Sequence, residues 1–112
     1  MFRPGDVVVI PYPFTDRTHT KMRPVLVITA ADGHGDFIGL AITSKSHHAD
    51  AIALKQRDME TGTLPKPSWI RTDKVFTLND SLLVKTVGRV TAQLMRQALS
   101  AVCGKLGCQS PP

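Results

Sequence analysis

The segment Arg23-Pro24-Val25-Leu26-Val27-Ile28 constrains the fold more than any other. In it, a proline that follows an arginine is the first residue of an apolar run. Because proline lacks a backbone N–H, a strand tolerates it at its first residue but poorly in its interior. The segment therefore predicts a buried strand over residues 24–29 that begins at the proline. Arg23 would then lie directly before the first residue of the strand, where a positive charge held in place can bind phosphate.

Other short apolar runs predict further strands around this one. They cover residues 7–10, 37–43, 51–54, 68–72 and 75–78. Pro11 and Pro13 should end the first of these strands. Residues 15–22 are polar and basic and predict an exposed loop, and residues 56–67 predict a long loop because they show no periodicity.

An amphipathic helix is predicted near the end of the chain. Its apolar residues follow helical spacing and are Leu94, Met95, Ala98, Val102 and Leu106. Thr91 is expected to cap its start, and Gly104 or Gly107 to end it. The 112 residues leave room for one domain, which we place at residues 1–108, followed by a disordered tail at residues 109–112.

Five or more short strands and one terminal helix predict a mainly β fold, a small and strongly curved antiparallel barrel with the helix packed on it. Such a barrel leaves one sheet face to cover. A symmetric homodimer is a common way to cover it.

The charge of the chain favours a polyanionic partner. Lys and Arg number 14 against 9 Asp and Glu, which gives a net charge of +5. Solubility alone is the competing explanation for this excess. No apolar run approaches the roughly 18 residues of a membrane helix, and the first residues do not resemble a secretion signal. We therefore expect a cytoplasmic protein with no membrane partner.

No metal or cofactor is expected. Cys103 and Cys108 have no matching Cys or His pair elsewhere in the sequence, so they make a poor zinc site and are expected to be reduced thiols. His47 and His48 with Asp50 lack a third ligand at a spacing suited to zinc.

The candidate chemistry is cleavage of RNA, which carries its own nucleophile in the 2′-hydroxyl. Such cleavage needs a base, positive charge on the phosphorane and a proton donor to the 5′-oxygen. Asp73 can act as the base, and Arg23 and Arg71 can hold the phosphate. Thr43 and Ser44 can donate hydroxyl hydrogen bonds to a phosphate oxygen.

Two alternatives stay open at this point. Arg71 and Asp73 lie two residues apart and would share one face of a strand, which also suits a simple surface ion pair. Lys66 and Lys74 would steer the backbone of the nucleic acid, or they are merely solvated.

Six segments, in this order, resemble the MazF/PemK toxins of bacterial type II toxin–antitoxin pairs. They are Gly5-Asp6-Val7-Val8-Val9, Arg23-Pro24-Val25-Leu26-Val27, Ile42-Thr43-Ser44, Leu64-Pro65-Lys66-Pro67-Ser68, Arg71-Thr72-Asp73-Lys74 and Val87-Gly88-Arg89-Val90. The resemblance extends from Gly5 to about Leu106. It implies an SH3-like barrel that forms a homodimer.

The resemblance also implies an activity: metal-independent, sequence-selective cleavage of single-stranded RNA to 2′,3′-cyclic phosphate and 5′-hydroxyl ends. It makes Arg23 and Thr43 the phosphate-binding pair and gives Arg71 and Asp73 the acid/base work. Since arginine is a poor proton donor, we assign Arg71 to charge stabilisation and leave the acid unassigned. The implied partners are messenger RNA, a cognate antitoxin that lies across the same surface and, through the antitoxin, operator DNA.

The first loop departs from the family pattern. Where the PemK branch has a histidine that stabilises the phosphorane, this chain has Arg17, with His19 two residues later. Both are candidates for substrate binding, and His19 is also a candidate acid. The alternatives are an inactive homologue, or a gyrase-poisoning toxin on the same fold. The second disagrees with the polar ending Gln109-Ser110-Pro111-Pro112, because that class depends on an apolar helical C-terminus.

Overall fold

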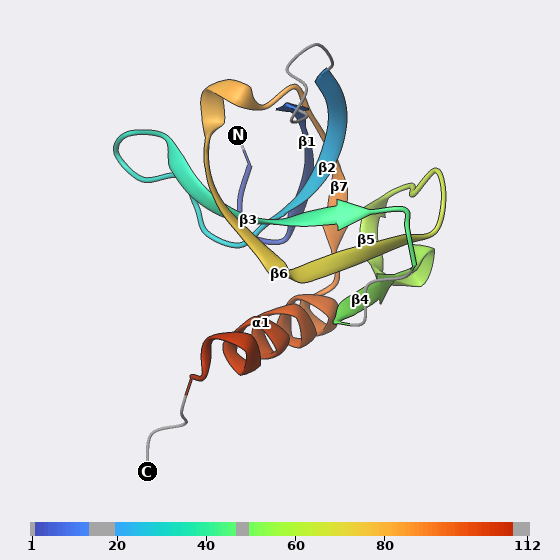
Figure 1. Cartoon of the computed structure of the whole chain (residues 1–112). Helices are drawn as coiled ribbons and strands as arrows, with labels where there is room; N and C mark the ends of the chain where they lie inside the picture. The colour runs from blue at the N-terminus through green and yellow to red at the C-terminus, as the bar shows by residue number, and fades with distance from the viewer. Residues whose placement is uncertain (1, 14–19, 47–49, 109–112) are drawn as a thin grey trace.

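The computed structural model describes residues 2–13, 20–46 and 50–108, which form seven strands and one α-helix (Figure 1). The strands are β1 Asp6–Pro13, β2 Thr20–Val27, β3 Asp36–Thr43, β4 Ala51–Leu54, β5 Met59–Gly62, β6 Ser68–Asn79 and β7 Lys85–Val90. Two short 3-10 helices, η1 Gln56–Asp58 and η2 Asp80–Leu82, precede β5 and β7, and α1 Ala92–Leu106 follows β7.

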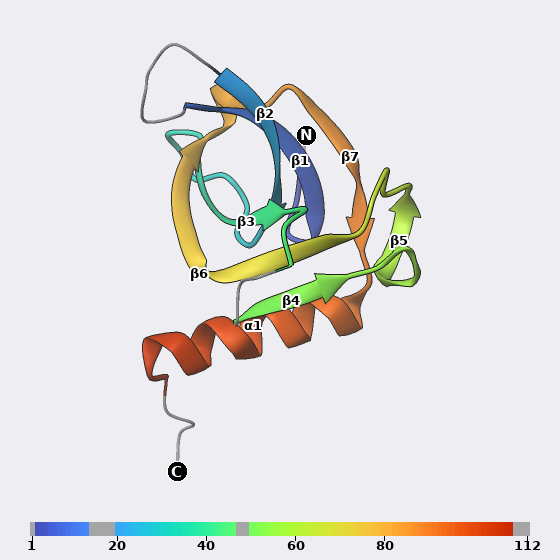
Figure 2. The same ribbon diagram turned by 45° about the vertical axis from the view of Figure 1, so that its right-hand side comes forward.

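All seven strands belong to one antiparallel sheet, in the order β4-β6-β3-β2-β1-β7-β5. Figure 2 shows this sheet curving into a half-barrel, with α1 running along its lower side near β4 and β6. The predicted mainly β barrel with a C-terminal helix is therefore confirmed. Within the described residues, no helix is long and apolar enough to cross a membrane.

The central strands bury side chains on both faces. On one face Val7 and Leu26 join the core beneath α1, which also contains Leu94 and Ala98. On the other face Val8, Val25 and Phe37 are among the residues that fill the inside of the barrel. Burial on both faces explains why the run at residues 7–10 is apolar without alternation.

Pro13 ends β1 as predicted, but Pro11 and Pro24 do not mark strand ends, and this part of the prediction is wrong. β1 runs through Pro11 to Pro13, and β2 begins at Thr20, so Arg23 and Pro24 lie within β2 opposite Ile10 and Val9. The reason is that, among the described strands, these stretches pair with a neighbour on one side only. β3 joins β2 from Val25 onward, and β7 joins β1 only as far as Val9. A missing N–H is tolerated where one side of the strand carries no ladder.

Two further predictions are corrected. Residues 56–67 contain η1 and β5 rather than one long loop, and residues 68–79 form the single strand β6 rather than two. β5 lies at the sheet edge and buries only Met59, so it has no alternation to detect. β7 was not predicted at all, because its first five residues are exposed or half-buried.

β6 carries a large irregularity opposite β3. Leu40 pairs with Val75 and Ile42 pairs with Ile70, so the four residues 71–74 lie opposite Ala41 alone. Such bulges bend a strand and redirect its side chains, and they are over-represented next to active sites. This one contains Arg71 and Asp73.

Helix α1 begins and ends as predicted. The Leu94 N–H donates to the Thr91 hydroxyl at 3.2 Å, and Gly107 ends the helix in a left-handed conformation with φ of 73°. Leu94 and Ala98 are buried, whereas Leu106 at the end of the stripe is 71% exposed.

Candidate active site

Three of the predicted catalytic residues line one hollow on the sheet. Arg23 comes from β2, Thr43 from the end of β3 and Arg71 from the bulge of β6, around a cavity of about 220 Å³. Lys74, predicted to bind substrate, lies in the same wall. Two side chains that the sequence analysis did not select, Lys45 and Phe76, also line this cavity, which we call the phosphate hollow.

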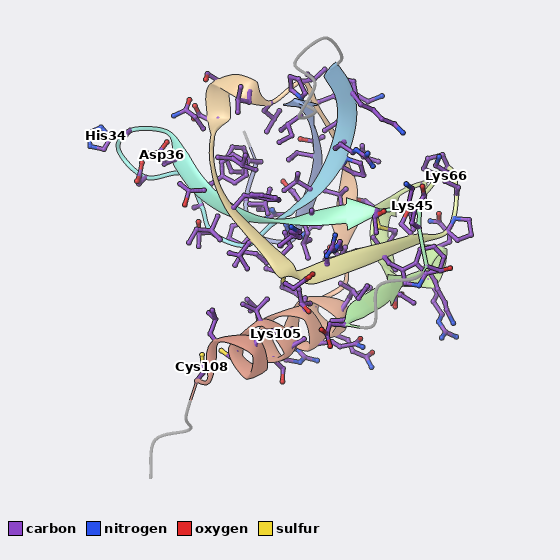
Figure 3. The ribbon with its side chains drawn as sticks, in the orientation of Figure 1. His34, Asp36, Lys45, Lys66, Lys105 and Cys108 are labelled. Atoms are coloured by element: carbon purple, nitrogen blue, oxygen red, sulfur yellow. The ribbon has the colours of Figure 1, made fainter. Side chains whose placement is uncertain are left out.

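A second hollow of about 680 Å³ shares Arg23 and Thr43 with the first. Ser44 and Lys66, both predicted to bind substrate, lie in its wall. The wall is otherwise largely aliphatic, with Lys21 and Lys85 adding positive charge. Figure 3 shows Lys45 and Lys66 at the same end of the molecule, beyond the tip of β3. Among the described residues that line the two hollows there is no Asp or Glu, so a polyanion would meet the positive charge of these side chains in both.

Local contacts fix the two strand ends that carry the site. The Lys45 N–H donates to the Thr43 Oγ1 at 3.1 Å, which orients that hydroxyl and leaves its hydrogen free to donate. The loop that contains Lys66 is held by the Gln56 side chain. Its oxygen accepts from the Leu64 N–H at 2.8 Å, and its amide nitrogen donates to the Gly62 carbonyl at 3.0 Å.

Asp73 forms a bidentate salt bridge with Arg71. It is not among the lining residues of the phosphate hollow. The Arg71 Nε donates to Asp73 Oδ1 at 3.1 Å, and Nη2 donates to Oδ2 at 2.7 Å. These hydrogen bonds from Arg71 are the main reason that the pKa of Asp73 lies below its usual value. Asp73 is therefore ionised at neutral pH, and it holds the guanidinium of Arg71 in one orientation.

The strand between these two residues is anchored from the helix side. Thr72 is buried, and its hydroxyl donates to the Asp50 carbonyl oxygen at 3.0 Å. The Asp50 carboxylate in turn accepts from Lys105 Nζ on α1 at 2.6 Å, and this bond raises the pKa of Lys105. The helix end thus contributes to the placement of Arg71 and Asp73.

The remaining candidates fall outside the site or outside the described residues. Arg17, His19, His47 and His48 are not among the residues that the structure describes. Trp69, the one tryptophan of the sequence, was not among the predicted site residues; it is half-buried and lines neither hollow. Over residues 2–13, 20–46 and 50–108, no three His, Cys, Asp or Glu side chains come together as a metal site would require.

The sequence carried partial signals for the residues that were missed. Lys45 follows the Thr43-Ser44 strand end directly and could have been selected for that reason. Phe76 could not have been, because it lies five residues after Arg71. In a regular strand an odd separation places two side chains on opposite faces, and only the bulge brings both to one hollow.

Comparison with known proteins gives one family and a consistent set of folds. The family of PemK-like, MazF-like toxins of type II toxin–antitoxin systems matches residues 3–106. Among solved structures, MazE–MazF from Deinococcus radiodurans has a TM-score of 0.77 at 15% identity, over 96% of this chain and 97% of that chain. No curated protein sequence matches.

Two mycobacterial structures are similar in the same way. An endoribonuclease from a mycobacterial species, in complex with its cognate antitoxin, has a TM-score of 0.73 at 18% identity, over 98% of this chain and 97% of that chain. The Mycobacterium tuberculosis toxin MazF-mt6 has a TM-score of 0.66 at 18% identity, over 92% of this chain and 99% of that chain. At these identities the structural likeness concerns the fold.

Proposed function

This chain belongs to the PemK-like, MazF-like toxins of type II toxin–antitoxin systems, and from that premise we propose that it cleaves single-stranded RNA at the phosphate hollow. The observation that carries the proposal is the meeting of Arg23, Thr43 and Arg71, from three strands, around one cavity. The described residues of its wall include no carboxylate. Both guanidinium groups can bind a phosphate through two hydrogen bonds each.

The proposed reaction needs no metal ion. The 2′-oxygen attacks the neighbouring phosphorus, the bond to the 5′-oxygen breaks, and the products are a 2′,3′-cyclic phosphate and a 5′-hydroxyl. Arg23 and Arg71 stabilise the charge of the phosphorane, and Thr43 donates a hydrogen bond to one of its oxygens. Lys45 and Lys74 add positive charge at the rim.

Asp73 takes the proton of the 2′-hydroxyl in this scheme. Its carboxylate is ionised, and each oxygen keeps a lone pair besides the one used by Arg71. The 5′-oxygen must receive a proton as it leaves. His19, the candidate offered by the sequence, lies outside the described residues, and we assign this proton to no residue.

The proposed partners follow from the same surface. One of the similar solved structures is a mycobacterial endoribonuclease in complex with its cognate antitoxin. An acidic segment of such an antitoxin would meet the cations of both hollows and exclude RNA by competition. The comparisons give no support to the gyrase-poisoning alternative, since the solved structures above are of endoribonucleases or MazF toxins.

The test is cleavage of a mixed single-stranded RNA by purified protein in the presence of EDTA. We expect fragments with cyclic phosphate ends from the wild type and none from Asp73→Ala. Arg96→Ala is the matched control, because Arg96 is exposed on α1 and lines neither hollow. RNA left equally intact by the wild type and Asp73→Ala would refute the enzyme proposal.

A further inference from the structure

The phosphate hollow contains one feature that phosphate binding does not require. Besides Arg23, Arg71 and Lys74, its wall includes Phe76. The other aromatic side chains that the structure describes are placed differently. Phe2 and Phe37 contact each other in the barrel core with ring centroids 4.5 Å apart, and Trp69 lines neither hollow.

The bulge of β6 is what brings this ring to the cations. Arg71 and Phe76 are five residues apart and would face opposite sides of a regular strand. Because residues 71–74 lie opposite Ala41 alone, the alternation resets, and Phe76 reaches the same hollow as Arg71.

A half-buried ring beside a phosphate site suits a nucleobase. Cations fix the backbone of a nucleic acid but read nothing of its bases, whereas an aromatic face stacks on any base. The ring is held by the strand and is not part of a loop, so a base stacked on it would be positioned relative to Arg23 and Thr43. Accurate placement of a reacting phosphodiester raises the rate of in-line attack.

We infer that Phe76 is a positioning residue that stacks on the nucleobase next to the scissile phosphate of single-stranded RNA. This inference rests on the proposed function and deepens it, because it assigns a base-binding subsite to the phosphate hollow. The subsite recognises a base by its π-face.

The test compares Phe76→Leu, which keeps apolar volume without an aromatic face, with Phe76→Tyr, which keeps the face. On RNA whose cleavage site has been mapped with the wild type, Phe76→Leu should lower kcat/KM by about 5- to 100-fold, as expected for the loss of one stacked base. Phe76→Tyr should remain within about 3-fold of the wild type, since its ring stacks similarly. Thr77→Ala, at the exposed next position on β6, is the matched control.

An abasic nucleotide separates stacking from a merely structural role. Abasic substrates are made by removing the base on either side of the scissile phosphate in turn. With the wild type, removal of the base that stacks on Phe76 should lower kcat/KM about as much as Phe76→Leu does. With Phe76→Leu, the same removal should change little further. An undiminished abasic penalty in Phe76→Leu would overturn the inference, as would wild-type rates for Phe76→Leu on intact RNA.

The two proposals can also fail separately. If the wild type does not cleave RNA, the proposed function fails. Whether a base stacks on Phe76 can still be measured with a single-stranded oligonucleotide that carries the fluorescent base 2-aminopurine. Quenching by the wild type that Phe76→Leu abolishes and Phe76→Tyr restores supports the subsite, and equal fluorescence with all three proteins overturns it.

Discussion

At the scale of single residues, the two arginines of the site differ in the hydrogen bonds that they already make within the protein. Arg23 and Arg71 both reach the phosphate hollow, but Arg71 already holds Asp73 with two hydrogen bonds. The pair aligns Arg71 and at the same time lowers the basicity of the proposed base. Asp73 can therefore act as a base or as an orienting group, and the two roles predict different pH profiles.

We expect the pH dependence of cleavage to identify the role of Asp73. The hydrogen bonds from Arg71 lower the pKa of Asp73 from 3.8, so the carboxylate is ionised at neutral pH. If Asp73 is the base, kcat/KM should therefore fall only in acid, below pH 3.8. Asp73→Asn should lower kcat by about 10²- to 10⁴-fold if Asp73 is the base. Retention of more than a tenth of the rate would assign it to orienting Arg71. A pH–rate profile of both proteins from the same preparation decides between these outcomes. An acid limb near neutral pH that survives in the variant would point to a histidine instead.

Arg23 offers a second test at this scale, because its planar guanidinium and the ammonium of lysine carry the same charge with different geometry. Arg23→Lys should lower kcat/KM by about 10- to 100-fold through loss of the two-pronged phosphate contact, an effect below that of deleting a whole donor. Arg96→Lys on α1 should leave the rate unchanged. Equal rates for both variants would mean that Arg23 acts only as a point charge. Steady-state cleavage at one fixed salt concentration is the measurement.

At the scale of elements, the sequence predicted what depends on local pattern. The helix cap at Thr91, its end at Gly107 and strand β4 all follow from short-range rules, and each is confirmed. β7 escaped prediction because its side chains are poorly buried, and the continuity of β6 was hidden by its bulge. The convergence of Arg23, Thr43 and Arg71 follows from strand order, which depends on contacts between residues far apart in the sequence. Residue types and the family resemblance therefore singled out Arg23, Thr43 and Arg71 in advance, whereas Lys45 was missed and the position of Phe76 depended on the bulge.

Close packing between β2 and β3 gives a prediction about stability. A Cβ added at Gly39 would lie 2.4 Å from Val25 Cγ1 and 3.3 Å from the Leu26 carbonyl oxygen. Gly39→Ala should therefore lower the free energy of unfolding by about 1–3 kcal/mol through overpacking. Gly104→Ala is the opposite case, because a Cβ added there on α1 would meet no described atom within 4 Å apart from its chain neighbours and the nearby backbone of the helix, and it should raise stability by about 0.5–1 kcal/mol. Urea denaturation of the two variants and the wild type tests both signs. A Gly39→Ala variant as stable as the wild type would show that β2 and β3 can move apart at no cost.

At the scale of the whole molecule, positively charged side chains gather around the two hollows. The two hollows contain Lys21, Arg23, Lys45, Lys66, Arg71, Lys74 and Lys85 among their lining residues. The acidic side chains Asp6 and Glu60 are paired with Arg89, away from both hollows. Asp6, in the segment Gly5-Asp6-Val7-Val8-Val9, thus has a structural role, because its carboxylate accepts a hydrogen bond from Arg89 and so ties β1 to β7. Under the proposed function, RNA and an acidic antitoxin segment would compete for the side chains of the two hollows.

This distribution predicts how binding depends on salt. For single-stranded nucleic acid, each phosphate contact contributes about −0.7 to the slope of log K against log salt concentration. Lys66→Ala should therefore reduce the slope by about 0.7 for an oligonucleotide made resistant to cleavage by 2′-deoxy substitution. Lys55→Ala should not change it, since Lys55 is exposed and lines neither hollow. Identical slopes for the two variants would remove Lys66 from the RNA-binding surface.

The outer side of α1 bears on the expected homodimer. Leu99 and Leu106 lie two turns apart on this helix and are 40% and 71% exposed in the single chain. Burying them against a second copy would remove apolar surface from water, at roughly 25 cal/mol for each Å². We expect the wild type to elute as a dimer in size-exclusion chromatography with light scattering. The double variant Leu99→Glu with Leu106→Glu should elute as a monomer with unchanged secondary structure, because neither side chain belongs to the core of one chain. Arg96→Glu, on the same helix, controls for added acidity. A wild type that stays monomeric at high concentration would rule out the dimer, and a double variant that remains dimeric would place the interface away from α1.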